Sequence, residues 1–154
     1  VGTGLALAGR AGVLATPVGG WAADRFDAGR VLALGSLLGA GYVFVLFAGM
    51  ASGSAVTAGL AIAGGYAFVI ALTSGAQGSF LAGLFPPRQR FSGIGIAREA
   101  NGAVVAGFTP MVAAWLVGQA GGAWWPAACF VAACCLTSAA AVVLWLRARP
   151  AAEH

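Results

Sequence analysis

The sequence contains no lysine, only one histidine, and very few charged residues of any type, which together make up 8% of the chain. Water-soluble domains contain roughly 25% charged residues, because the surface of a soluble protein has to be largely polar. Hydrophobic residues account for 60% of these 154 positions. The shortage of charge therefore excludes a soluble domain, and we predict an integral membrane protein.

The residue types of common catalytic and metal sites are also missing. The single histidine, His154, is the last residue, so no Ser/His/Asp set and no histidine metal cluster is recognisable. Cys129, Cys134 and Cys135 occur in one apolar segment without CxxC spacing, as expected of small apolar residues in a membrane helix. No phosphate-binding glycine loop is present. We therefore expect neither enzymatic activity nor a cofactor or metal site.

Arginine supplies all of the positive charge: eight basic residues against four acidic ones give a net charge of +4. In a soluble protein such a balance favours nucleic-acid binding. Here the arginines form short clusters between apolar stretches, which is typical of the cytoplasmic loops of membrane proteins. The expected partner is a lipid bilayer, and nucleic-acid binding is not expected.

Five apolar stretches are each long enough to cross a hydrocarbon core about 30 Å thick. No alternating strand pattern favours a barrel, so the predicted fold is all-α integral membrane. The 25 glycines are mostly inside these stretches, where small residues let helices approach closely. The predicted spans are residues 2–23, 31–50, 55–84, 91–117 and 123–146, in a bundle covering residues 1–149 and followed by a cytoplasmic tail at 150–154.

The arginines outside the spans predict an orientation. They occur in the first and third loops and at the C-terminal end, whereas the turns near residues 51–54 and 118–122 are uncharged. This alternation places the C-terminus in the cytoplasm, as expected for a bacterial inner-membrane protein. Trp124 and Trp125 would then lie at the outer interface. Five spans with an external N-terminus is an awkward number, so we expect further transmembrane helices upstream.

Two adjacent opposite charges, Arg98 and Glu99, interrupt the fourth predicted span. A charge at membrane depth costs roughly 2.5–3.5 kcal/mol on insertion scales and is functional by default. Neighbours on a helix point about 100° apart and cannot neutralise each other well, whereas Arg98 shares a side with Asn101. We expect Arg98 and Asn101 to bind an anionic substrate group and Glu99 to bind the proton. The alternative is that both charges pair with other helices or extend toward the membrane surface.

Two other polar residues occur inside predicted spans. Gln77, in the third span, could line a cavity or bond across helices, and it is a further candidate for the substrate site. Arg10, in the first span, lies about 21 Å from the cytoplasmic end. At that depth its long side chain can reach the outer interface, so for Arg10 we favour anchoring over function.

The first loop combines Gly20, Asp24, Arg25 and Arg30. Asp24 follows the C-terminal end of its own helix, where the helix dipole disfavours an anion. The start of the fourth span, near Ser92, lies on the same side of the membrane and would stabilise that carboxylate. These loop residues could form a latch that exists only when the cytoplasmic ends are closed. The alternative is an ordinary solvated loop.

These motifs together resemble a known family. The Gly20-x-x-x-Asp24-Arg25 pattern resembles the cytoplasmic-loop motif of the major facilitator superfamily. A second pattern is similar to the metabolite:proton symporter family of that superfamily, at the two ends of the penultimate helix and at the start of the last one. Its residues are Phe85-Pro86, Arg90-Phe91-Ser92-Gly93, Gly107-Phe108-Thr109-Pro110 and Gly121-Gly122-Ala123-Trp124-Trp125-Pro126.

The resemblance implies that the chain provides the last five of twelve helices, most of the C-terminal half of such a transporter. It also implies symport of a small polar metabolite with a proton, and Arg98 favours a carboxylate or a zwitterion. The chain departs from the family where Asp27, Ala28 and Gly29 replace a Gly-Arg-Arg run, and where Arg98-Glu99 replaces a neutral pair. The alternative function is that of a truncated, non-transporting membrane protein, either a relic or an assembly partner that docks through its helices.

Overall fold

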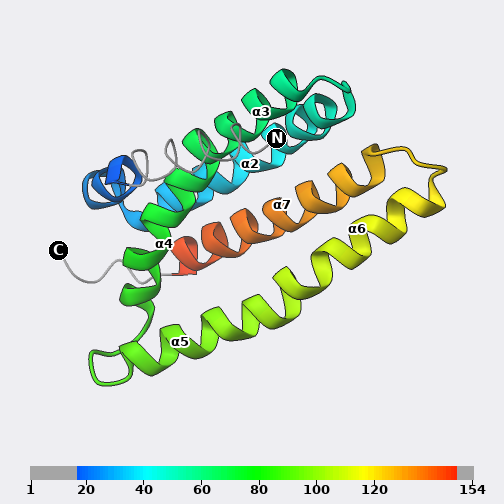
Figure 1. The fold of residues 1–154 in the computed structure, drawn as a ribbon. Coiled ribbons are helices and arrows are strands. Elements are labelled where there is room, and N and C mark those ends of the chain that lie inside the picture. Colours follow the sequence, from blue (N-terminus) through cyan, green and yellow to red (C-terminus); the bar gives the residue numbers. More distant parts are fainter. Residues whose placement is uncertain (1–16, 149–154) are drawn as a thin grey trace.

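The computed structural model describes residues 17–148, and its secondary structure there is entirely helical (Figure 1). The all-α prediction is confirmed for this part of the chain. Most of the first predicted span, together with Arg10, lies outside the described residues. Residues 17–26 are helical and include the end of that span.

Four long helical stretches follow, and each coincides closely with a predicted span. Two of them are continuous α-helices, and the other two contain a short π-helical segment between two α-helical parts. They are α2 (Ala28–Ala51); α3 (Ala55–Gly64), η1 (Gly65–Ile70) and α4 (Ala71–Leu84); α5 (Arg90–Asn101), η2 (Gly102–Ala106) and α6 (Gly107–Gln119); and α7 (Trp125–Ala148).

Within the described residues, three helices are long and apolar enough to cross a membrane: Ala28–Ala51, Ala55–Leu84 and Trp125–Ala148. Their length and composition make this chain a membrane protein. The stretch from Arg90 to Gln119 is helical throughout but is not among these three, and it contains the adjacent charges Arg98 and Glu99.

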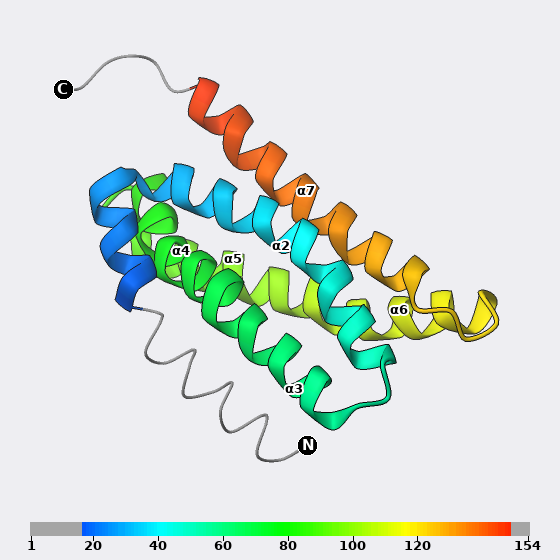
Figure 2. The ribbon, with the colours of Figure 1, turned by 90° about the horizontal axis from the view of Figure 1, so that it is seen from above.

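Helix α2 is the centre of the bundle. It packs along α7 on one side and against α3, η1 and α4 on the other (Figures 1 and 2). The buried residues at these contacts are small, and no large side chain in the described part of the chain is fully buried. Close approach of helix backbones is how membrane helices gain packing energy when there is no water to expel. The buried residues of α2 and α7 include Ala33, Gly35, Gly39, Ala40, Ala127, Ala128, Ala132 and Ala139.

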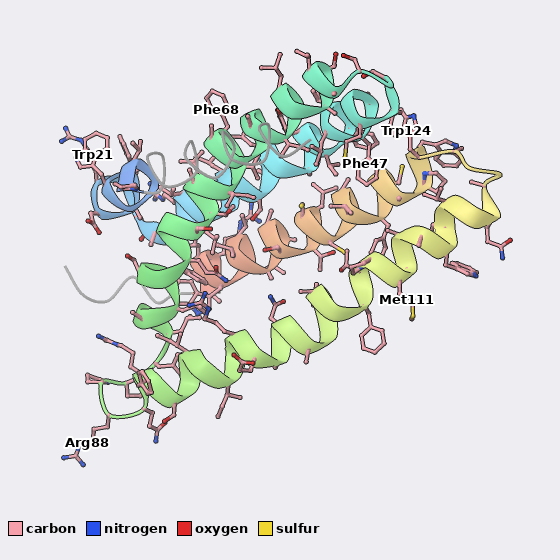
Figure 3. All side chains as sticks on the ribbon, in the orientation of Figure 1. Trp21, Phe47, Phe68, Arg88, Met111 and Trp124 are labelled. Atoms are coloured by element: carbon pink, nitrogen blue, oxygen red, sulfur yellow. The ribbon has the colours of Figure 1, made fainter. Side chains whose placement is uncertain are left out.

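The two ends of the bundle differ in charge. One end contains the residues before α2, the loop between α4 and α5, and the C-terminal end of α7, all of which include arginine (Figure 1). The other end contains the two uncharged turns, at residues 52–54 and 120–124. Aromatic contacts join helices at both ends: Phe80 meets Trp145 edge-on at 5.0 Å at the charged end, and Phe47 stacks on Trp124 at 6.5 Å at the uncharged end (Figure 3).

The uncharged turns are formed by residues with special backbone or capping properties. Ser54 caps α3 by accepting a hydrogen bond from the Thr57 N–H. Gly121 and Gly122 both have positive φ angles, which L side chains rarely adopt. That conformation lets the Gly122 N–H reach the Val117 carbonyl at 2.9 Å and end α6.

Asp27 determines the start of α2. Its carboxylate accepts hydrogen bonds from the Gly29 N–H at 2.9 Å and the Arg30 N–H at 3.3 Å, although its φ of 75° is unfavourable for a residue with a Cβ. Asp27 also lines a small cavity of about 50 Å³ together with Ser79 of α4 and Trp145 of α7. Asp27 is therefore a structural residue of the charged end.

We expect the substitution Asp27→Ala to destabilise the fold by about 1–2 kcal/mol, because it removes the helix cap while keeping a Cβ at a positive φ. Unfolding of the chain in detergent, followed by circular dichroism, would measure the loss. Asp24→Ala is the matched control: the Asp24 side chain is exposed and forms no hydrogen bond with the described residues, so its removal should change stability by less than about 0.5 kcal/mol. Equal losses in the two variants would contradict the capping role.

Candidate functional site

The stretch from Arg90 to Gln119 is the least enclosed part of the structure. Among helices α2 to α7, α5 packs only against α4, and α6 packs only against α7. No residue of α5 or α6 is buried. In Figure 1 this stretch runs beside α7 at the α6 end and lies away from it at the α5 end. One long helix is thus held at its two ends, with its middle exposed.

Three polar residues, Arg98, Glu99 and Asn101, lie about a third of the way along this stretch, and we call them the polar segment. All three side chains are exposed, in the last turn of α5. Arg98 and Asn101 are three residues apart and face the same side of the helix, whereas Glu99 points about 100° away. Neither charged residue forms an ion pair with any part of the chain at residues 17–148. The polar segment can therefore meet an external charged group without first breaking an internal contact.

The π-helical segment η2 begins directly after the polar segment. The Gly102 N–H bonds to the carbonyls of Arg98 and Glu99, and the Gly107 N–H then reaches back five residues to Gly102. Pro110 has no N–H to donate, and the hydroxyl of the preceding Thr109 donates to the Val105 carbonyl. Pro and hydroxyl back-bonding both bend helices, and π-helical segments occur frequently at functional sites. The helix therefore departs from regular α-helical hydrogen bonding directly after Arg98 and Glu99.

A second π-helical segment, η1, interrupts the stretch from Ala55 to Leu84 in the same way. Here too a threonine follows, and the Thr73 hydroxyl donates to the Val69 carbonyl at 2.8 Å. Tyr42 of α2 lies against Gly64 and Gly65, and its hydroxyl donates to the Ala61 carbonyl at 2.8 Å. Neither irregularity is visible in the hydropathy pattern, which is apolar throughout η1 and η2.

The residues of the predicted latch lie at the charged end, but the predicted contact is not formed in this conformation. The Asp24 side chain is exposed and has no hydrogen bond or ion pair within residues 17–148, and Gln89, the residue before α5, provides no side-chain cap. The guanidinium of Arg25 lies over the Trp21 ring at 5.7 Å, and Trp21 itself is on the outside of the molecule (Figure 3). Docking of Asp24 onto α5 thus stays a prediction for another conformation.

Two other members of the latch have different surroundings. Arg30 is exposed on the first turn of α2, where its backbone N–H bonds to Asp27. Gly20 lies directly against the backbone of α4, next to Gly75. The Asp27 cap is a local contact, and an aspartate directly before an apolar run is a signal that could have identified it in the sequence. The Gly20 contact depends on how the helices pack.

The remaining candidates are not joined to the polar segment. Gln77 is exposed on α4, and no hydrogen bond within residues 17–148 links it to another side chain. Cys129 and Cys134 are exposed on α7, and Cys135 is partly buried there. In the described part of the chain, no three His, Cys, Asp or Glu side chains are grouped as metal ligands would be.

The polar segment on an otherwise apolar helix is therefore the best candidate for a functional site. Comparisons with known proteins identify no relative of this chain. The chain matches no family model, and neither a curated protein nor a solved structure is significantly similar to it.

Proposed function

We propose that this chain is part of a secondary active transporter that moves a small carboxylate or zwitterion together with a proton. In this proposal it provides the last five of twelve helices of a major-facilitator fold, of the metabolite:proton symporter type. The charged end of the bundle faces the cytoplasm of a bacterium, in accordance with the distribution of arginine.

The observation that supports this function best is the exposure of Arg98, Glu99 and Asn101 about a third of the way along a helix held only at its ends. If lipid tails surrounded this segment, each charge would cost about 2.5–3.5 kcal/mol. The segment is stable at membrane depth only where it faces a polar surface or an aqueous pathway. Secondary transporters place such residues near the membrane midplane, between two helical halves that move against each other.

The chemistry of the polar segment also matches the proposed substrate. Arg98 offers a planar donor pair for a carboxylate, and Asn101 on the same side can donate a further hydrogen bond. Glu99 is separate from this donor set and can gain or lose a proton without occupying the anion site. An anion and a proton would thus have different ligands on one turn of helix.

The second candidate is a non-transporting membrane protein whose exposed helix docks onto a partner. The same exposure favours it, because a partner helix of opposite charge would neutralise the polar segment equally well. The two functions differ in what passes through the membrane. A docking protein would give no saturable uptake of a metabolite, even when the upstream helices are present.

We expect the 154-residue chain alone to show no uptake, because a pathway closed alternately at both ends needs two helical halves. Expression together with the helices encoded upstream should give saturable uptake of labelled small carboxylates or zwitterionic amino acids that is abolished by a protonophore. Empty membranes and membranes with the short chain are the controls. Uptake by neither form would favour the docking protein, and uptake by the short chain alone would contradict the proposed architecture.

A further inference from the structure

An apolar cavity of about 360 Å³ lies between α2, the α3–η1 segment and α7. Its wall includes Gly39 and Tyr42 from α2, Ile62 and Val69 from α3 and η1, and Cys135 from α7. The Tyr42 hydroxyl already donates to the Ala61 carbonyl, and no side-chain polar atom buried in residues 17–148 lacks a partner. An ordered water molecule would need two to four polar partners, and this apolar lining does not offer them.

Glycines let the walls of this cavity approach each other closely. A Cβ atom added at Gly39 would lie 3.0 Å from Val69 Cγ1 and 3.7 Å from the Cys135 sulfur. At Gly65 an added Cβ would lie 3.2 Å from the Tyr42 ring. Val69 and Gly65 belong to the π-helical segment η1, so the irregular part of this helix forms one wall. The cavity results from the way the three helices pack together, and not from one small side chain in place of a larger one.

The cavity is open to the outside of the described bundle. Met50 and Ile70 belong to its lining and are 55% and 40% exposed. Both are in helices apolar enough to cross a bilayer, so a bilayer around these helices would place hydrocarbon beside the opening. An engineered apolar cavity of about 150 Å³ already binds benzene. This larger one has room for a longer apolar segment, and leaving it empty would forfeit dispersion contacts along its whole wall.

We propose that this cavity is a binding site for one acyl chain of a membrane phospholipid. The chain enters between Met50 and Ile70 and ends near Tyr42 and Cys135, while its head group stays at the membrane surface. The site requires no charged residue and does not depend on transport. Its chemical selectivity is for an uncharged, flexible hydrocarbon.

Cavity-filling variants would test the site by native mass spectrometry of the chain purified in neutral detergent with dioleoyl phosphatidylethanolamine. The unmodified chain should retain a single phospholipid, and Cys135→Phe should reduce the retained fraction by about tenfold or more because the ring occupies the cavity. Cys134→Phe is the matched control, since Cys134 is the adjacent residue and is exposed outside the cavity. Equal retention by both variants, or no retention by the unmodified chain, would overturn the proposal.

A second measurement leaves the cavity unfilled and so does not depend on the folding of Cys135→Phe. With Cys129 and Cys134 replaced by serine, alkylation of Cys135 by N-ethylmaleimide should slow by about threefold or more when the same phospholipid is added. With Cys134 as the only cysteine, the lipid should leave the rate unchanged. Protection of both thiols, or of neither, would contradict acyl-chain binding at this cavity.

Discussion

Replacing Gly75 by alanine should destabilise the bundle by about 3 kcal/mol, because a methyl group at this position has no space. The added Cβ would lie 2.6 Å from the carbonyl carbon and 2.9 Å from the Cα of Gly19. Both are main-chain atoms of the helix at residues 17–26, so they cannot rotate away as a flexible side chain could. The two helices would have to separate, and their contacts along α4 would be lost.

The control for this prediction is Gly78→Ala, three residues further along α4. An added Cβ at Gly78 has no atom within 4 Å. Alanine is a better helix former than glycine by about 0.5–1 kcal/mol, so this variant should be neutral or slightly more stable. Thermal unfolding of both variants in the same detergent would compare them. Equal stability of the two variants would show that the close contact between residues 19 and 75 contributes nothing.

The positions of the helices could be predicted because the signals that define them are local. Apolar stretches of sufficient length, the Pro86-Pro87 pair, Ser54 and the Gly121-Gly122 pair mark helices and turns without reference to the rest of the chain. The fourth stretch illustrates this, since residues 91–117 were predicted and the helix extends from Arg90 to Gln119. Which helix lies at the centre is not a local property, because α2, α7 and α3 are all similarly apolar.

The candidate site could be predicted in part, for the same reason. Arg98, Glu99 and Asn101 are conspicuous in any apolar stretch, whatever their surroundings. The π-helical segment that follows them could not be predicted, because it depends on a shift of backbone hydrogen bonds that no residue type specifies. Likewise the acidic loop was recognised, but the residue that forms hydrogen bonds there is Asp27 and not Asp24.

Replacing Glu99 by glutamine in the complete transporter should abolish proton-driven accumulation while preserving the shape of the site. Glu99 is the acidic residue of the stretch from Arg90 to Gln119, and the other two described carboxylates, Asp24 and Asp27, lie at the charged end of the bundle. An imposed gradient of about one pH unit is equivalent to about 1.4 kcal/mol per proton and supports roughly tenfold accumulation. Without an acidic side chain at this depth, that accumulation should fall to the outside concentration.

The measurement is uptake of the labelled substrate into proteoliposomes with an imposed pH gradient and a clamped membrane potential. Exchange of internal for external substrate should persist in Glu99→Gln, because exchange needs the binding site but no net proton movement. Arg90→Gln is a suitable control, since Arg90 is exposed at the start of the same helix, outside the polar segment. Full accumulation in Glu99→Gln would place proton coupling elsewhere in the transporter. Loss of both accumulation and exchange would instead assign Glu99 to substrate binding.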